Sequence, residues 1–136
     1  MRDVAYVALG SNLGDREGYL ARARAAIDEL PYTRIVRMSS IEETLPLGGL
    51  DQPPYLNQMV AVETTLAPRE LLARLVEIEA REGRQRDERW ASRTLDLDIV
   101  CFDQQTVNEP DLQVPHPGLE TREFWQRELA ELRAIP

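Results

Sequence analysis

Two aspartates stand two residues apart in the segment 93–100, which reads Arg-Thr-Leu-Asp-Leu-Asp-Ile-Val. Aliphatic residues alternate with Asp96 and Asp98, the period-2 pattern of a half-buried strand. Side chains two apart on a strand share a face, so both carboxylates point the same way. Neighbouring carboxylates repel unless a cation lies between them, and Mg²⁺ takes one or two carboxylates together with substrate phosphates. The pattern therefore favours a magnesium site; the alternative is the solvated acidic face of an antiparallel sheet.

Arginines precede this strand. Between positions 81 and 93, five arginines against three acids give a local charge of +2 in a chain of net charge −8. Such a reversal suits an anionic ligand, although a charge-mixed run is usually a solvated loop. Trp90 weakens the second interpretation, because an indole needs a partner to cover it. All 16 basic residues are arginine, which excludes the phosphate-binding lysine of Walker A and protein-kinase sites.

Two further segments could contribute to a site. Residues 44–54 are rich in glycine and proline, and loops of this length are usually functional or disordered. Three prolines favour a preformed wall for a ligand. His116, the one histidine, stands between two prolines; a lone histidine is more often structural or merely exposed. The stretch 10–14 predicts a strand-to-helix turn with Asp15 as N-cap, rather than a phosphate loop.

Length and composition limit the class of protein. A chain of 136 residues with 43% hydrophobic and 29% charged residues predicts one soluble globular domain, 1–136. We expect no membrane span and no signal peptide. The single Cys101 predicts a reducing, cytoplasmic compartment and a buried position after the aspartate strand. A pI near 4.7 disfavours nucleic-acid binding, and the oligomeric state stays open, with a monomer favoured.

The hydrophobic periodicity predicts an order of strand, helix, strand, strand, helix and strand, followed by a C-terminal helix. This order is typical of an α+β, ferredoxin-like βαββαβ fold, in which an antiparallel sheet carries its helices on one face. Pro31 ends the first helix, Pro68 begins the second and Gly83 ends it. The expected strands are 4–9, 33–43, 55–66 and 95–100; 107–114 is short and turn-rich, and the last helix is 122–132.

Six stretches, in the same order along the chain, together resemble the family of 6-hydroxymethyl-7,8-dihydropterin pyrophosphokinases. These folate-pathway enzymes move a pyrophosphoryl group from ATP to a pterin alcohol and release AMP. The stretches are Gly10-Ser11-Asn12-Leu13-Gly14, Thr44-x-Pro46-Leu47-Gly48, Asp51-Gln52-Pro53-x-Tyr55-Leu56-Asn57, Ile78-Glu79 with Gly83-Arg84, Arg89-Trp90 with Arg93-Thr94-Leu95-Asp96-Leu97-Asp98, and Pro115-His116-Pro117 with Arg122-x-Phe124.

The resemblance implies a role for each matching residue. Asp96 and Asp98 would hold Mg²⁺, and Asp98 would also orient the pterin hydroxyl, with Arg84 and Arg93 as further catalytic groups. The pterin would lie among Thr44, Pro46, Leu47, Tyr55, Asn57 and Phe124. ATP would contact Glu79, Arg84, Arg86, Trp90, Arg93, His116 and Arg122, and the arginine–tryptophan loop could close over it.

The last helix departs from the family pattern. After Phe124 the sequence reads Trp-Gln-Arg-Glu-Leu-Ala-Glu-Leu, and it keeps only Leu129, Glu131 and an aliphatic residue at 132. The alternative function is therefore a catalytically weakened or inactive ferredoxin-like relative that binds a ligand or a partner. The retained aspartate pair, arginine cluster, asparagine and histidine favour the enzyme, because a binding module does not need all of them together.

Overall fold

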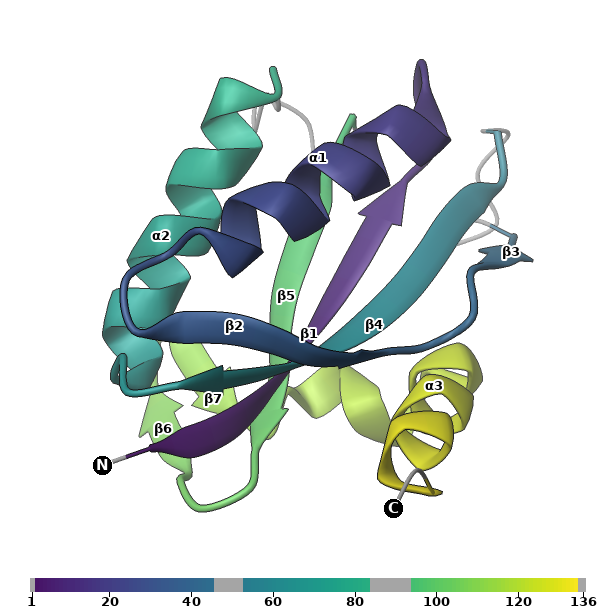
Figure 1. Cartoon of the computed structure of the whole chain (residues 1–136). Helices are drawn as coiled ribbons and strands as arrows, with labels where there is room; N and C mark the ends of the chain where they lie inside the picture. Colours follow the sequence, from purple (N-terminus) through teal and green to yellow (C-terminus); the bar gives the residue numbers. More distant parts are fainter. Residues whose placement is uncertain (1, 46–52, 84–93, 135–136) are drawn as a thin grey trace.

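The computed structural model describes residues 2–45, 53–83 and 94–134. Five strands form one sheet in the order β2-β4-β1-β5, and the short β3 pairs with β4. Every one of these pairings is antiparallel (Figure 1). The sheet strands are β1 (Asp3–Ser11), β2 (Thr33–Met38), β3 (Glu42–Thr44), β4 (Tyr55–Thr64) and β5 (Asp96–Phe102), and the helices are α1 (Arg16–Asp28), α2 (Pro68–Arg81) and α3 (Glu123–Ala134).

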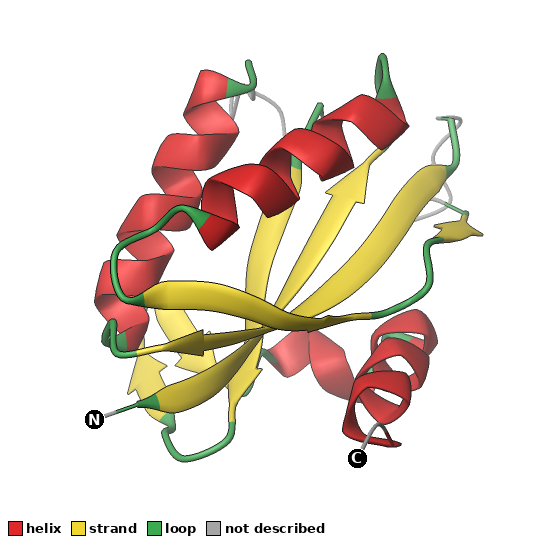
Figure 2. Cartoon of the chain, in the orientation of Figure 1, coloured by secondary structure: helices red, strands yellow, loops and turns green. Residues whose placement is uncertain are grey.

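The helices divide between the two faces of the sheet. α1 and α2 lie on one face, whereas α3 lies on the other (Figure 2). The larger core joins Leu20 and Ile27 of α1 and Leu71 of α2 to the sheet. A smaller core joins Trp125 and Leu129 of α3 to the opposite face. The predicted ferredoxin-like arrangement is confirmed, and the additional C-terminal helix covers part of the face that α1 and α2 leave open.

Local side-chain chemistry accounts for the first residues of α1 and α2. Asp15 is the N-cap of α1, as predicted, and its side chain accepts the N–H of Gly18 at 3.1 Å. Pro68 occupies the first turn of α2, where a missing N–H costs nothing. The side chain of Glu70 accepts the N–H of Ala67 at 3.0 Å. Among the described helices, none has the length and apolar character that crossing a membrane would require.

The predicted strand 33–43 is wrong, because β2 and β3 are separate strands. Ser39 lies between them, and its hydroxyl accepts the N–H of Met59 at 2.9 Å. A side-chain oxygen here takes the place of a main-chain acceptor, so the regular ladder with β4 is interrupted. The chain resumes pairing at Glu42, which lies opposite Asn57.

Two other boundaries differ from the prediction. The turn-rich segment 107–114 is a β-hairpin of β6 (Val107–Glu109) and β7 (Leu112–Val114), with Pro110 and Asp111 between the strands. Gly10 and Ser11, predicted in a turn, belong to β1 and pair with β4. A short 3-10 helix, Pro117–Glu120, precedes α3. The predicted burial of Cys101 is confirmed.

Candidate functional site

Two polar side chains flank a glycine in a row across three neighbouring strands, near the end of β1. Gly10 of β1 pairs with Asp96 on β5 and with Asn57 on β4. Residues directly opposite each other on paired strands project to the same face. Trp125 and Leu129 of α3 cover the other end of this face, near Tyr6. The row therefore lies on the part of the face beyond that core.

The two aspartates share this face, as predicted from their spacing. Asp96 lies opposite Gly10 and Asp98 opposite Ala8, one row further along β1. Both side chains are partly exposed. In the described ranges, no cluster of three or more His, Cys, Asp or Glu side chains could hold a metal ion. A cation on the aspartate pair would therefore draw its other ligands from elsewhere, such as water or a bound anion.

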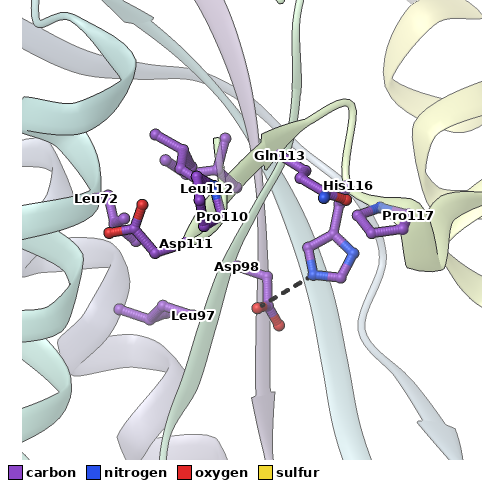
Figure 3. A pocket seen from close by; sticks show the side chains of 10 residues that line it. Leu72, Leu97, Asp98, Pro110, Asp111, Leu112, Gln113, His116 and Pro117 are labelled. Atoms are coloured by element: carbon purple, nitrogen blue, oxygen red, sulfur yellow. Dashed lines mark ion pairs between the residues drawn. The ribbon is translucent and has the colours of Figure 1, made fainter. Parts of the chain in front are cut away.

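His116 faces Asp98 across the site. Its Nε2 lies 3.9 Å from Oδ1 of Asp98 (Figure 3). Its Nδ1 accepts the backbone N–H of Gly118 at 2.9 Å, which assigns the ring proton to Nε2. Burial lowers the pKa of His116, as does the charge of Arg122, while Asp96 acts in the opposite direction. The ring is therefore neutral at neutral pH and presents an N–H donor to the site.

A β-bulge in β5 holds the histidine segment. Tyr6 pairs with Cys101 and Val7 pairs with Ile99, so Val100 is an extra residue. The carbonyl of Val100 instead accepts the N–H of His116 at 2.7 Å. The irregularity in the strand thus anchors the segment that carries the histidine.

Arg122 lies beside this histidine at the start of α3. Its guanidinium stacks over Trp125, 4.2 Å from the ring centroid. The rings of Trp125 and His116 pack edge to face, with their centroids 4.9 Å apart. Gly118 makes this packing possible, since a Cβ there would lie 2.9 Å from Nε of Arg122 and 3.1 Å from Nδ1 of His116. Sequence reasoning missed Gly118, because only the fold brings these side chains around it.

Glu79 holds α2 against the aspartate strand. Its side chain is only 2% exposed, and it accepts the N–H of Leu97 at 2.7 Å. Leu97 lies between Asp96 and Asp98, so this bond fixes the backbone that carries both carboxylates. In the described structure Glu79 therefore supports the strand segment that carries both aspartates.

The other end of the row is built by β1, β3 and β4. The amide of Asn57 donates to Thr44 Oγ1 at 2.5 Å. A Cβ on Gly10 would lie 3.3 Å from Asn57 Oδ1 and 3.5 Å from the ring of Tyr55, so glycine lets the β1 backbone approach both side chains. Phe124, in the first turn of α3, is partly buried with its ring 6.2 Å from that of Trp125.

Six of the predicted site residues lie outside the described ranges: Pro46, Leu47, Arg84, Arg86, Trp90 and Arg93. The structure does show how the end of the segment 44–54 is held. Asn12 donates to the carbonyl of Pro53 at 3.2 Å, and Arg16 donates to that of Pro54 at 2.9 Å. Arg16 also pairs with Glu43 at 2.9 Å. The turn after β1 thereby supports the Gly/Pro-rich segment.

A cavity of about 360 Å³ opens beside Asp98 and His116. It lies between α2, β5 and the β6–β7 hairpin, and Figure 3 shows the side chains around it. Arg69 of α2 holds the hairpin through two bonds of 3.0 Å to Asp111. Sequence reasoning missed this cavity, whose aliphatic walls suit a flat ring; its lining includes Leu72, Leu97, Ile99, Leu112 and Gln113.

Together the fold and site define a ferredoxin-like domain with a paired-carboxylate site on one face of its sheet. A family model described as 7,8-dihydro-6-hydroxymethylpterin-pyrophosphokinase (HPPK) matches residues 6–134. The chain belongs to this family, as the resemblance of its motifs predicted.

Named relatives agree with that assignment. The chain is 44% identical to a Bacillus subtilis protein and 46% identical to one from Pseudomonas aeruginosa, over 97% and 93% of its length. It spans 79% and 78% of these relatives. Both are named 2-amino-4-hydroxy-6-hydroxymethyldihydropteridine pyrophosphokinase.

Solved structures support the fold. The HPPK-DHPS of Plasmodium falciparum, described with SDX-DHP, aligns with a TM-score of 0.70 at 15% identity over 96% of the chain. A second HPPK-DHPS structure, described as a complex with substrates, gives 0.67 at 14% identity. The chain spans 40% of each of these longer proteins, so the likeness concerns the fold alone.

Proposed function

We propose that this chain transfers the pyrophosphoryl group of MgATP to the hydroxymethyl group of 6-hydroxymethyl-7,8-dihydropterin, releasing AMP, in folate biosynthesis. Family membership and the names of its relatives support this activity. The observation that carries it is the row Asp96, Gly10 and Asn57 across three neighbouring strands. The comparisons favour the enzyme over an inactive binding module.

The row sets the distance between the two proposed substrate positions. Two strand spacings separate β5 from β4, about 10 Å. A metal and phosphate site at Asp96 and a flat ring at Asn57 would therefore be neighbours on one face. Pyrophosphoryl transfer needs chiefly positioning and charge stabilisation from the protein. Substrates placed at the two ends of the row meet that need.

The aspartates suit Mg²⁺, which is the cofactor we propose. Their carboxylate oxygens are the ligands that Mg²⁺ prefers, and it completes its coordination with water and substrate phosphates. When bound, the ion would neutralise charge on the ATP phosphates. Asp98 would in addition orient the pterin hydroxyl for attack on the β-phosphorus, and Asp96 would serve the metal alone.

ATP would lie along β5. The base would enter the cavity between α2 and the β6–β7 hairpin, and His116 would donate its Nε2–H to a phosphate oxygen. Arg122 would offer a fork of donors beside it. Glu79 would lie near the adenosine. Further ATP contacts would come from Arg84, Arg86, Trp90 and Arg93, and Arg84 and Arg93 would act on the transferred phosphates.

The pterin would lie at the β4 end of the row. Asn57 and Thr44 would bond its polar edge together with Pro46 and Leu47. Tyr55 and Phe124 would stack on its two flat faces, where aromatic contacts favour a planar ring. We also propose that 1–136 is one pyrophosphokinase domain, cytoplasmic and monomeric, without a nucleic-acid partner.

The direct test is AMP release from MgATP with and without 6-hydroxymethyl-7,8-dihydropterin. We expect AMP only when the pterin is present, together with a pyrophosphorylated pterin in equal amount. AMP formation that does not depend on the pterin would contradict the proposed acceptor. Ligand binding without AMP formation would instead support the binding module.

The pterin position can be tested at Asn57. We expect Asn57→Ala to raise the KM for the pterin about 10- to 100-fold, because the ring then loses its amide partner and Thr44 its donor. The KM for ATP should change little. Asn108→Ala, on the exposed β6, is the matched control and should leave both constants unchanged. An equal rise in both KM values would contradict a pterin-specific role.

A further inference from the structure

α3 buries an acidic side chain that the activity does not use. Glu128 is 2% exposed and lies on the same side of the helix as Trp125 and Leu129. Within the described residues, both of its carboxyl oxygens are buried and have no hydrogen-bond partner. A lone charge in such a place would be costly, so a neutral carboxylic acid is favoured.

A second carboxyl group, that of Glu42 on β3, acts on the Glu128 carboxyl. Burial raises the pKa of Glu128 to about 9, and Glu42 is the second cause. Glu131 acts in the same direction and Arg127 against it, and both belong to α3 itself. Arg127 pairs with the Glu42 carboxylate at 3.3 Å, so a positive charge lies beside that carboxylate.

These contacts join α3 to one short segment of the sheet edge. Glu131 accepts the N–H and hydroxyl of Ser40 at 2.8 and 2.9 Å. Arg127 pairs with Glu42, two residues beyond Ser40. Glu42 lies opposite Asn57 in the strand register. The helix is therefore fixed to the strand that borders the proposed pterin site.

We propose that protonated Glu128 donates its proton to a hydrogen bond with the Glu42 carboxylate, and that this bond positions α3 and Phe124 against the pterin site. Phe124 precedes Glu128 by four residues, so the two side chains lie one helical turn apart on one side of α3. Glu128 is thus a positioning residue, acting through Phe124 on one side and Asn57 on the other. This inference rests on the proposed pterin site.

The bond has a consequence at alkaline pH. Once Glu128 loses its proton, two carboxylates face each other and repel. α3 then loses its neutral contact with β3, while Glu79 and His116, which we assign to ATP, keep their hydrogen bonds to β5. The KM for the pterin should therefore rise above about pH 9 while the KM for ATP stays level.

The test compares Glu128→Gln with the wild-type enzyme between pH 7 and 10. Glutamine keeps a donor toward Glu42 but does not titrate. We expect the wild-type KM for the pterin to rise several-fold over this range and that of Glu128→Gln to rise clearly less. Because both enzymes use the same pterin, the difference between their KM profiles cancels any titration of the pterin itself. Glu120→Gln, an exposed acid of the 3-10 helix before α3, should follow the wild type. The same alkaline rise in Glu128→Gln, or an equal rise in the KM for ATP, would overturn the inference.

A second measurement does not depend on activity. The folded chain keeps the Glu128 proton up to about pH 9, whereas the unfolded chain loses it near the ordinary value of 4.5. Wild-type stability must therefore fall as pH rises between those values. The unfolding temperature of Glu128→Gln should gain on the wild type across this interval and level off above it. A constant difference would refute the protonated acid, even if AMP assays had already refuted the proposed substrate.

Discussion

Replacing Asp96 by alanine should reduce pterin-dependent AMP formation about a thousandfold or more, which corresponds to about 4 kcal/mol in the activation free energy. The variant would leave one carboxylate, that of Asp98, to hold the ion that we propose. The stability of the fold should change little, because the Asp96 side chain is partly exposed at the beginning of β5. Turnover by coupled AMP detection measures the effect, and calorimetry should show weaker Mg²⁺-dependent nucleotide binding.

Asp103→Ala provides the matched control. Asp103 follows the opposite end of β5, where it contacts Arg133 at 3.4 Å outside the proposed site. We expect this variant to keep wild-type turnover and Mg²⁺ dependence. Unchanged turnover in Asp96→Ala, with the same requirement for Mg²⁺, would contradict the metal role of the strand.

Replacing Glu79 by alanine should lower the free energy of unfolding by about 2–4 kcal/mol, because a buried N–H of Leu97 loses its acceptor and a cavity forms. Turnover should fall as well, since Leu97 lies between the two aspartates. Glu79→Gln keeps a carbonyl acceptor and should recover part of both losses. Urea unfolding and AMP release measure the two effects on the same preparations.

Glu77→Ala is the control for this pair, because Glu77 lies on the exposed side of the same helix. It should change neither stability nor turnover. The comparison also separates two roles of Glu79. A variant of unchanged stability with weakened ATP binding would show that Glu79 contacts the nucleotide directly, and that its bond to Leu97 does little to support the strand.

The order of the main elements could be predicted because periodicity reports burial directly. Alternation along 95–100 placed both aspartates on one face, and the register confirms it. The break between β2 and β3 could not be predicted, because it depends on Ser39 meeting Met59, twenty residues away. The β6–β7 hairpin was missed for a related reason: each strand has only three residues, too few for a period to show.

The candidate site divides in the same way. The aspartate pair was predicted from spacing, and the other site residues from motif resemblance. Gly118 was missed because its importance arises from Arg122 and His116, which pack around it only in the folded chain. Glu128 was missed because sequence reasoning expects an acid to be exposed. Its burial follows from the position of Trp125 and Leu129 on the same helix.

The bulge at Val100 divides β5 into two halves with different phases of alternation. Before it, Asp96 and Asp98 point to the sheet face that α3 partly covers, and after it Cys101 points to the same face. Deleting Val100 would restore regular pairing and leave both halves of the strand on their present faces, because Ile99 and Cys101 already lie opposite adjacent residues of β1. The same deletion would remove the carbonyl that holds His116. Insertions and deletions should therefore be tolerated far less at this point than in the loops on either side of the strand.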